Sequence, residues 1–165
     1  MSDVRFPSVS GYNLQRRRID LPGGLQGQVN LLIVPFQRWQ QDLVDTWIPL
    51  LTELEQLFPG LAYYELPTIY RMNLLSRTLL NEGMRAGIPN QKARDRTITL
   101  YLDTAEFRRS LVIESEATIT LLLIDRAGQV LWRTTGAYDE GEARRLALAL
   151  AGQIPPAFES LWTRS

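Results

Sequence analysis

The chain has 165 residues, and 45% of them are hydrophobic, so the sequence predicts one domain over residues 1–165 whose core needs no covalent staple. It contains no cysteine and no histidine, which excludes thiol chemistry, disulfides and the commonest metal ligands, and we expect no cofactor. The 18 basic and 18 acidic residues cancel, so no overall electrostatic field favours a nucleic-acid partner.

The sequence also indicates where the protein works. No stretch is long and apolar enough to span a bilayer, and residues 1–10 lack the basic-then-apolar pattern of a signal peptide. We therefore expect a cytoplasmic protein without a transmembrane segment. A carboxylate-only metal site stays open, although the acidic residues are scattered and form no Asp-x-Asp loop.

The first local feature is an arginine run, QRRRID, which contains Arg16, Arg17 and Arg18. If this segment is a strand, Arg16 and Arg18 share one face and Arg17 points to the other. The favoured interpretation is an edge strand that charge protects from aggregation. The alternative is a site for anions or lipid headgroups.

The segment VNLLIVPF (29–36) is apolar on both faces, which predicts a central strand covered by helices on both sides. A helix over residues 40–58 should follow, ended by Pro59 and Gly60, with a local kink at Pro49. Three-to-four spacing predicts its buried stripe. The stripe comprises Leu43, Trp47, Leu50, Leu51, Leu54, Leu57 and Phe58.

The middle of the chain alternates between strands and helices. Strands are predicted at residues 61–66 and 97–102, with a helix over 73–85 between them. A short helix should begin after Asp103, whose carboxylate can accept from first-turn amides while Glu106 reaches back in a capping box.

The last third predicts a hairpin followed by a helix. Segment 118–125 is a buried strand, Gly128 permits the turn, and 129–136 must return antiparallel because the connection is short. Trp132 should face a covering helix, and the alternative is contact with a partner. A final helix begins near Asp139, with Glu142 completing a second capping box. The buried stripe of this helix should comprise Ala143, Leu146, Ala147 and Leu150. The tail residues Ile154, Phe158, Leu161 and Trp162 should dock onto the domain, and the alternative is an exposed peptide anchor.

The order of these elements predicts a mixed-sheet α/β protein. The segment TITLLLIDRAGQVLWRTTGAYDEGEARRLALALAG resembles the C-terminal unit of the thioredoxin fold, with Gly128 and Gly136 at its two glycine positions. PFQRWQQDL resembles the segment around the redox cysteines, with Gln40 and Leu43 at the cysteine positions. Ile119 stands where thioredoxins have a cis proline, and we expect a trans bond there. The resemblance implies a thioredoxin-like mixed sheet flanked by helices, without redox activity.

A second resemblance covers most of the chain. FPSVSGYNL, LPGGLQGQVNLLIV, TWIPLL, ITLYLDTAEFRRSL and LLLIDRAGQVLWRTTGAYDEGEARRL together resemble a divergent thioredoxin-like family. That family includes the mitochondrial assembly factor for the membrane sector of ATP synthase. The resemblance implies an assembly or chaperone role in a protein that we expect to be bacterial.

The turn that replaces the redox centre is the predicted site. Its residues, together with the loop that precedes the strand at 120–125, should form a groove for a partner protein: Gln37, Arg38, Trp39, Gln40, Gln41 and Ile119. At a helix start, free amides and the helix dipole favour carbonyl oxygens and anions, and tryptophan is enriched in binding hot spots. The alternative is an exposed helix start with Trp39 packed on the core.

Two classes of function follow from this sequence. The first is a non-catalytic binding protein, a chaperone or assembly factor that grips an extended segment of another protein, such as a subunit of a membrane complex. The second is an enzyme or small-ligand-binding protein with replaced chemistry that uses Asp42, Glu65 or Asp103. The first class is preferred, because it needs only shape and backbone amides, whereas the second needs a titratable pair that the sequence does not identify.

Overall fold

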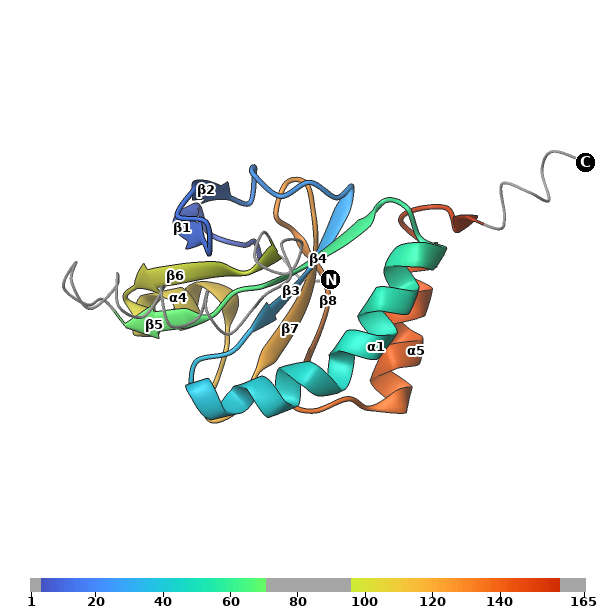
Figure 1. Ribbon diagram of the computed structural model, residues 1–165. Helices are drawn as coiled ribbons and strands as arrows, with labels where there is room; N and C mark the ends of the chain where they lie inside the picture. The colour runs from blue at the N-terminus through green and yellow to red at the C-terminus, as the bar shows by residue number, and fades with distance from the viewer. Residues whose placement is uncertain (1–3, 71–95, 158–165) are drawn as a thin grey trace, which may run out of the picture.

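The centre of the protein is a four-stranded sheet with strand order β4-β3-β7-β8, in a computed structural model that describes residues 4–70 and 96–157 (Figure 1). Its strands are β3 (Val29–Val34), β4 (Leu61–Glu65), β7 (Thr120–Asp125) and β8 (Val130–Thr135). β3 pairs parallel with β4 and antiparallel with β7, and β7 pairs antiparallel with β8. The predicted antiparallel return is therefore confirmed, and Gly128 supports its turn with a φ of 88°.

A second four-stranded sheet has the order β2-β1-β6-β5. Its strands are β1 (Val9–Asn13), β2 (Arg18–Leu21), β5 (Thr68–Tyr70) and β6 (Ile98–Leu102). β1 is antiparallel to both neighbours, whereas β5 runs parallel to β6. The chain leaves the first sheet after Glu65 and pairs with β6 from Thr68 onward. The predicted mixed-sheet α/β class is confirmed, with its strands divided between two sheets.

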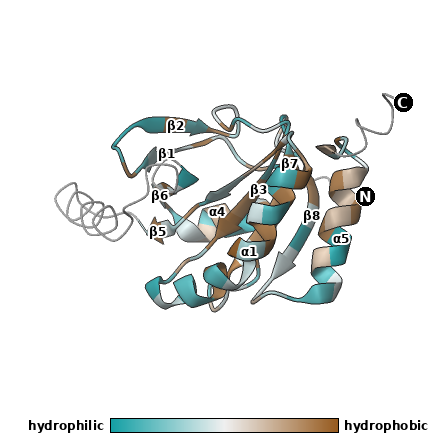
Figure 2. Ribbon diagram, turned by 45° about the vertical axis from the view of Figure 1, so that its right-hand side comes forward, coloured by the Kyte–Doolittle hydropathy of each residue, from teal (hydrophilic) through white to brown (hydrophobic). Residues whose placement is uncertain are grey.

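Helices α1 (Gln41–Leu57) and α5 (Glu140–Ala151) pack side by side on one face of the central sheet (Figure 1). Helix α4 (Thr104–Leu111) and the second sheet cover the other face. All residues of β3 are buried, as predicted, but helices alone cover only one face, because the second sheet together with α4 covers the other. Hydrophobic residues accordingly concentrate in β3 and β7 and along the inner sides of α1 and α5 (Figure 2). Within the described part of the chain, no helix is long and apolar enough to cross a membrane.

Helix α1 confirms most of the predicted stripe. Trp47, Leu51 and Leu54 are buried, and Phe58 is buried just after the helix. Leu57 is an error in the prediction, because its side chain is 41% exposed. Phe58 adopts an extended backbone at the C-terminal cap and occupies the core position instead. The helix continues through Pro49.

Both shorter helices begin at the predicted aspartates. The Asp103 carboxylate accepts from the amide of Glu106, and the Asp139 carboxylate accepts from the amide of Glu142. The Glu142 side chain pairs with Arg145 one turn later, so in α5 the aspartate supplies the cap. Each cap satisfies an amide that has no partner within its helix, which fixes where the helix begins.

Other predictions are corrected or confirmed at the edges of the fold. Arg16 and Arg17 lie in the turn before β2, and Arg16 has a φ of 66°, so Arg16 and Arg18 do not share a strand face. Ile154 is buried in the core, as predicted for the tail. The predicted helix over 73–85 lies outside the described residues. The same holds for the tail positions Phe158, Leu161 and Trp162.

Candidate functional site

Three loops meet where β3 ends. The chain leaves β3 through Pro35 and forms a short 3-10 turn (Arg38–Gln40) that runs directly into α1. The Gln37 side chain of this first loop donates to the carbonyl of Glu116, in the loop before β7. That second loop is tied to the loop after β8, because the Gly136 amide donates to the carbonyl of Ile119. The predicted groove region is thus a single surface built from distant parts of the sequence.

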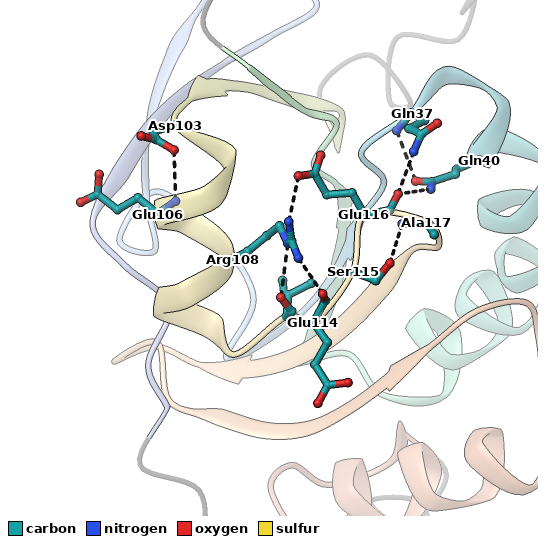
Figure 3. Close-up of polar contacts among 10 residues, drawn as sticks. Gln37, Gln40, Asp103, Glu106, Arg108, Glu114, Ser115, Glu116 and Ala117 are labelled. Atoms are coloured by element: carbon teal, nitrogen blue, oxygen red, sulfur yellow. Dashed lines mark hydrogen bonds and ion pairs between the residues drawn. The ribbon is translucent and has the colours of Figure 1, made fainter.

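Gln40 is the internal support of this surface. Its side chain is fully buried, and its Oε1 accepts from the amides of Phe36 at 2.8 Å and Gln37 at 3.3 Å. Its Nε2 donates to the Glu116 carbonyl at 2.7 Å (Figure 3). The prediction that Gln40 contacts a partner is therefore wrong, because its side chain is buried and bonded within the protein. A buried carboxamide occupies the position that the resemblance gives to a cysteine.

Trp39 faces solvent and is held there. Its side chain is 55% exposed, and its indole N–H donates to Oε1 of Gln37 at 2.9 Å. Gln37 is fixed in turn, because its Nε2 donates to the Glu116 carbonyl at 3.0 Å (Figure 3). The alternative in which Trp39 packs on the core is wrong. Arg38 and Gln41 are also exposed beside it.

Ile119 does not line the surface. Its side chain is fully buried, in the same cluster as Leu121 and Leu123. Alternate residues of a strand point to one side, so Ile119 continues the row that faces α1 and α5. Its backbone carbonyl accepts from the Gly136 amide and so joins this loop to the loop after β8. The Thr118–Ile119 bond is trans as predicted, since Leu21–Pro22 is the cis bond among the described residues.

Arg108 fixes the second loop, and sequence reasoning missed it. Its guanidinium donates to the Glu114 carbonyl at 2.6 Å and pairs with the Glu116 carboxylate at 3.1 Å (Figure 3). It also donates to the carbonyl of Ile113. The carbonyl that anchors Gln37 and Gln40 is thereby held by α4. An arginine near a helix C-terminus is too common for the sequence to have signalled this role.

Trp47 fixes the third loop. Its indole N–H donates to the Gly136 carbonyl at 2.9 Å, and its ring packs edge-on against Trp132 and Tyr138 at centroid distances of 6.4 and 5.4 Å. The Tyr138 amide donates to the Thr46 hydroxyl. Trp132 therefore faces the covering helix, as predicted, and the loop after β8 is bound to α1.

The three carboxylates that the enzymatic alternative would use lie in different parts of the structure. Asp103 caps α4, Asp42 lies in the first turn of α1, and Glu65 ends β4. Burial raises the pKa of the Glu65 carboxyl, and the nearby charge of Asp45 raises it further. Asp45, which accepts from the Gln41 side chain, was not among the predicted site residues.

The raised pKa of Glu65 leads to a prediction about the stability of a variant at this position. The folded protein favours the neutral form of this side chain, so ionising it above the ordinary pKa of 4.5 opposes folding. Glu65→Gln should therefore increase the free energy of unfolding at pH 7. The gain should shrink as the pH falls and disappear below 4.5, where Glu65 is protonated in both states. Urea denaturation across this range measures it. Glu53→Gln, at an exposed position of α1, is the control, and an equal gain in both variants would contradict the assignment.

Comparison with known proteins rests on structure. No protein-family model matches the chain, and no curated protein matches it. Among solved structures, BsSco, a member of the Sco family of cytochrome c oxidase assembly proteins, matches with a TM-score of 0.59 at 12% identity, over 90% of this chain and 94% of that chain. The exposed lipoprotein thioredoxin Etrx1 of Streptococcus pneumoniae matches with a TM-score of 0.56 at 13% identity, over 88% and 99%. A thiol:disulfide interchange protein from Bacteroides sp. gives 0.57 at 12% identity, over 90% and 88%.

These similarities show the fold. The chain has a thioredoxin-like fold, as its sequence predicted, and it combines that fold with a sequence that lacks cysteine. The turn before α1 carries a buried glutamine and an exposed, hydrogen-bonded tryptophan.

Proposed function

We propose that the protein is a non-redox binding protein that holds a segment of another protein on the surface around Trp39. The observation that carries the proposal is an exposed tryptophan whose orientation is fixed by hydrogen bonds through Gln37 to the Glu116 carbonyl. An aromatic side chain that is already ordered loses little conformational entropy on binding, which favours affinity. Tryptophan is also among the residues most enriched in binding hot spots.

The surrounding structure supports this proposal. Glutamine and arginine side chains flank Trp39 at positions 37, 38 and 41, and all of them are exposed. Protein-binding patches usually have an apolar centre that is surrounded by a polar rim. The loops beneath it are held by Gln40 and Arg108, so the patch is a rigid platform. Rigid support keeps a binding residue in its productive geometry.

An assembly role is the form of this proposal that we favour. The sequence resembles the family of the ATP synthase membrane-sector assembly factor, and one solved structure with this fold belongs to a family of cytochrome c oxidase assembly proteins. The partner would be an extended segment of a membrane-complex subunit.

The test is capture of partners from the native source with a matched pair of variants. Trp39→Ala should weaken partner capture by about 2 kcal/mol or more, the usual scale for a hot-spot residue. Leu148→Ala removes another exposed hydrophobic side chain, 73% exposed on α5, and should leave capture unchanged. Equal capture by wild type and Trp39→Ala, or equal losses in both variants, would refute a role for the Trp39 surface.

A further inference from the structure

A cavity of about 380 Å³ lies away from the Trp39 surface, between the β1–β2 turn, the segment before β3 and the outer edge of β4. None of its lining residues belongs to the three loops that meet at the end of β3. Small-molecule sites of proteins begin at about 300 Å³. The lining includes Asn13, Arg17, Ile19, Tyr63, Tyr64 and Arg96.

Asn13 presents a donor to this cavity. Its Oδ1 accepts from the amides of Gln15 and Arg17 at 2.9 and 3.0 Å and thereby shapes the β1–β2 turn. This use of Oδ1 fixes the orientation of the carboxamide. Asn13 is 4% exposed and lines the cavity, and both side-chain hydrogen bonds that hold it in the described part of the chain use Oδ1, not Nδ2. A carboxamide N–H₂ group that lines a cavity can donate to a ligand that accepts a hydrogen bond.

The charged side chains that line the cavity carry a net positive charge. Arg96 donates to both carboxylate oxygens of Glu55 at 3.0 and 3.2 Å, so these two charges compensate each other. Arg17 also lines the cavity, and its guanidinium makes no ion pair among residues 4–70 and 96–157. The adjacent Arg18 differs, because Asp20 pairs with it at 3.2 Å outside the cavity. One uncompensated guanidinium at a concave site favours an anion.

The rest of the lining is suited to an organic group. The Tyr64 hydroxyl accepts from the Gln26 amide, which leaves its O–H as a further donor. Ile19, Ala62 and the Tyr63 ring supply apolar surface, and the Arg96 guanidinium covers one face of that ring at 3.9 Å. Hydrogen-bond donors and apolar side chains therefore line the same cavity.

We propose that this cavity binds a small organic anion, a carboxylate or phosphate monoester with an apolar body. The anionic group would accept hydrogen bonds from Asn13 Nδ2 and the Arg17 guanidinium, and the apolar body would lie against Ile19 and Tyr63. Of the three arginines in the sequence run, the structure assigns the binding role to Arg17. This proposal stands independently of the Trp39 surface.

The test is a titration of the full chain with benzoate, phenyl phosphate and inorganic phosphate, followed by amide NMR shifts at constant ionic strength. At least one organic anion should give saturable shifts at residues 13–17 and 26 and should bind several-fold more tightly than inorganic phosphate. Comparison of benzoate with phenyl phosphate decides between carboxylate and phosphate chemistry. Arg17→Gln should weaken binding about tenfold or more, because it removes a charge-assisted contact.

Two further variants keep the test decisive. Arg18→Gln should bind like wild type, because Arg18 is paired with Asp20 outside the cavity. Asn13→Asp retains an oxygen for the two turn amides but replaces the donor with a negative charge, so it should abolish binding in a folded protein. No saturation with any of the three anions, or equal losses in Arg17→Gln and Arg18→Gln, would overturn the proposal.

Discussion

Replacing Gln40 with leucine should destabilise the protein by about 3 kcal/mol, because a buried unpaired polar group costs about 1–3 kcal/mol. The substitution keeps a side chain of similar length but leaves the amides of Phe36 and Gln37 without the Oε1 acceptor that they share. It also removes the donor to the Glu116 carbonyl. The substitution therefore breaks the bonds of Gln40 to the loop after β3 and to the loop before β7, which together hold the Trp39 surface.

Chemical denaturation of wild type, Gln40→Leu and Gln41→Leu measures this loss. Gln41 is the neighbouring glutamine, but it is exposed, and its side chain donates to Asp45 on the surface of α1 and also interacts with Glu65. Its substitution should change the free energy of unfolding by no more than about 0.5 kcal/mol. A Gln40→Leu variant as stable as Gln41→Leu would show that the buried carboxamide does not hold the loops.

Trp47→Ala should have the largest effect on stability, about 3–5 kcal/mol, as expected for truncating a fully buried aromatic side chain. The loss combines a cavity between α1 and the central sheet with the broken hydrogen bond to the Gly136 carbonyl. The edge-on contacts with Trp132 and Tyr138 are lost as well.

Two further variants, Trp47→Phe and Leu57→Ala, separate the contributions of buried volume, the indole hydrogen bond and position in the helix. Phenylalanine keeps most of the buried volume but has no N–H for Gly136, so its cost should fall well below that of alanine. Leu57 lies in the same helix and is exposed, so Leu57→Ala should cost little. Thermal and chemical unfolding provide the measurement. Similar losses for Trp47→Ala and Leu57→Ala would contradict the packing described for α1.

Much of this fold could be predicted because local sequence patterns and tertiary structure agree. The apolar run of β3, the helical spacing in α1 and the cap aspartates Asp103 and Asp139 each predict one element, and each element forms. The short strands β1 and β5 carry no such signal. β1 contains a glycine, and β5 has only three residues, so both strands depend on their pairing with neighbouring strands rather than on local preference.

The sequence indicated the region of the candidate site but not how its side chains lie. Helix-start reasoning identified the turn at residues 37–41, and Trp39 is exposed there. The burial of Gln40 could not be predicted, because its acceptor lies on Glu116, 76 residues further along the chain. Arg108 and Asn13 were missed for the same reason, since their importance comes from a loop or cavity that only the folded chain creates.

The most direct test of the central claim measures binding and stability on one sample of Trp39→Ala. The partner obtained by capture is immobilised, and the dissociation constant is determined per folded molecule alongside the free energy of unfolding. We predict that binding weakens by about 2 kcal/mol or more, as for a hot-spot tryptophan, while stability changes by no more than about 0.5 kcal/mol. A large loss of stability with unchanged affinity per folded molecule would contradict the claim that Trp39 is the binding residue.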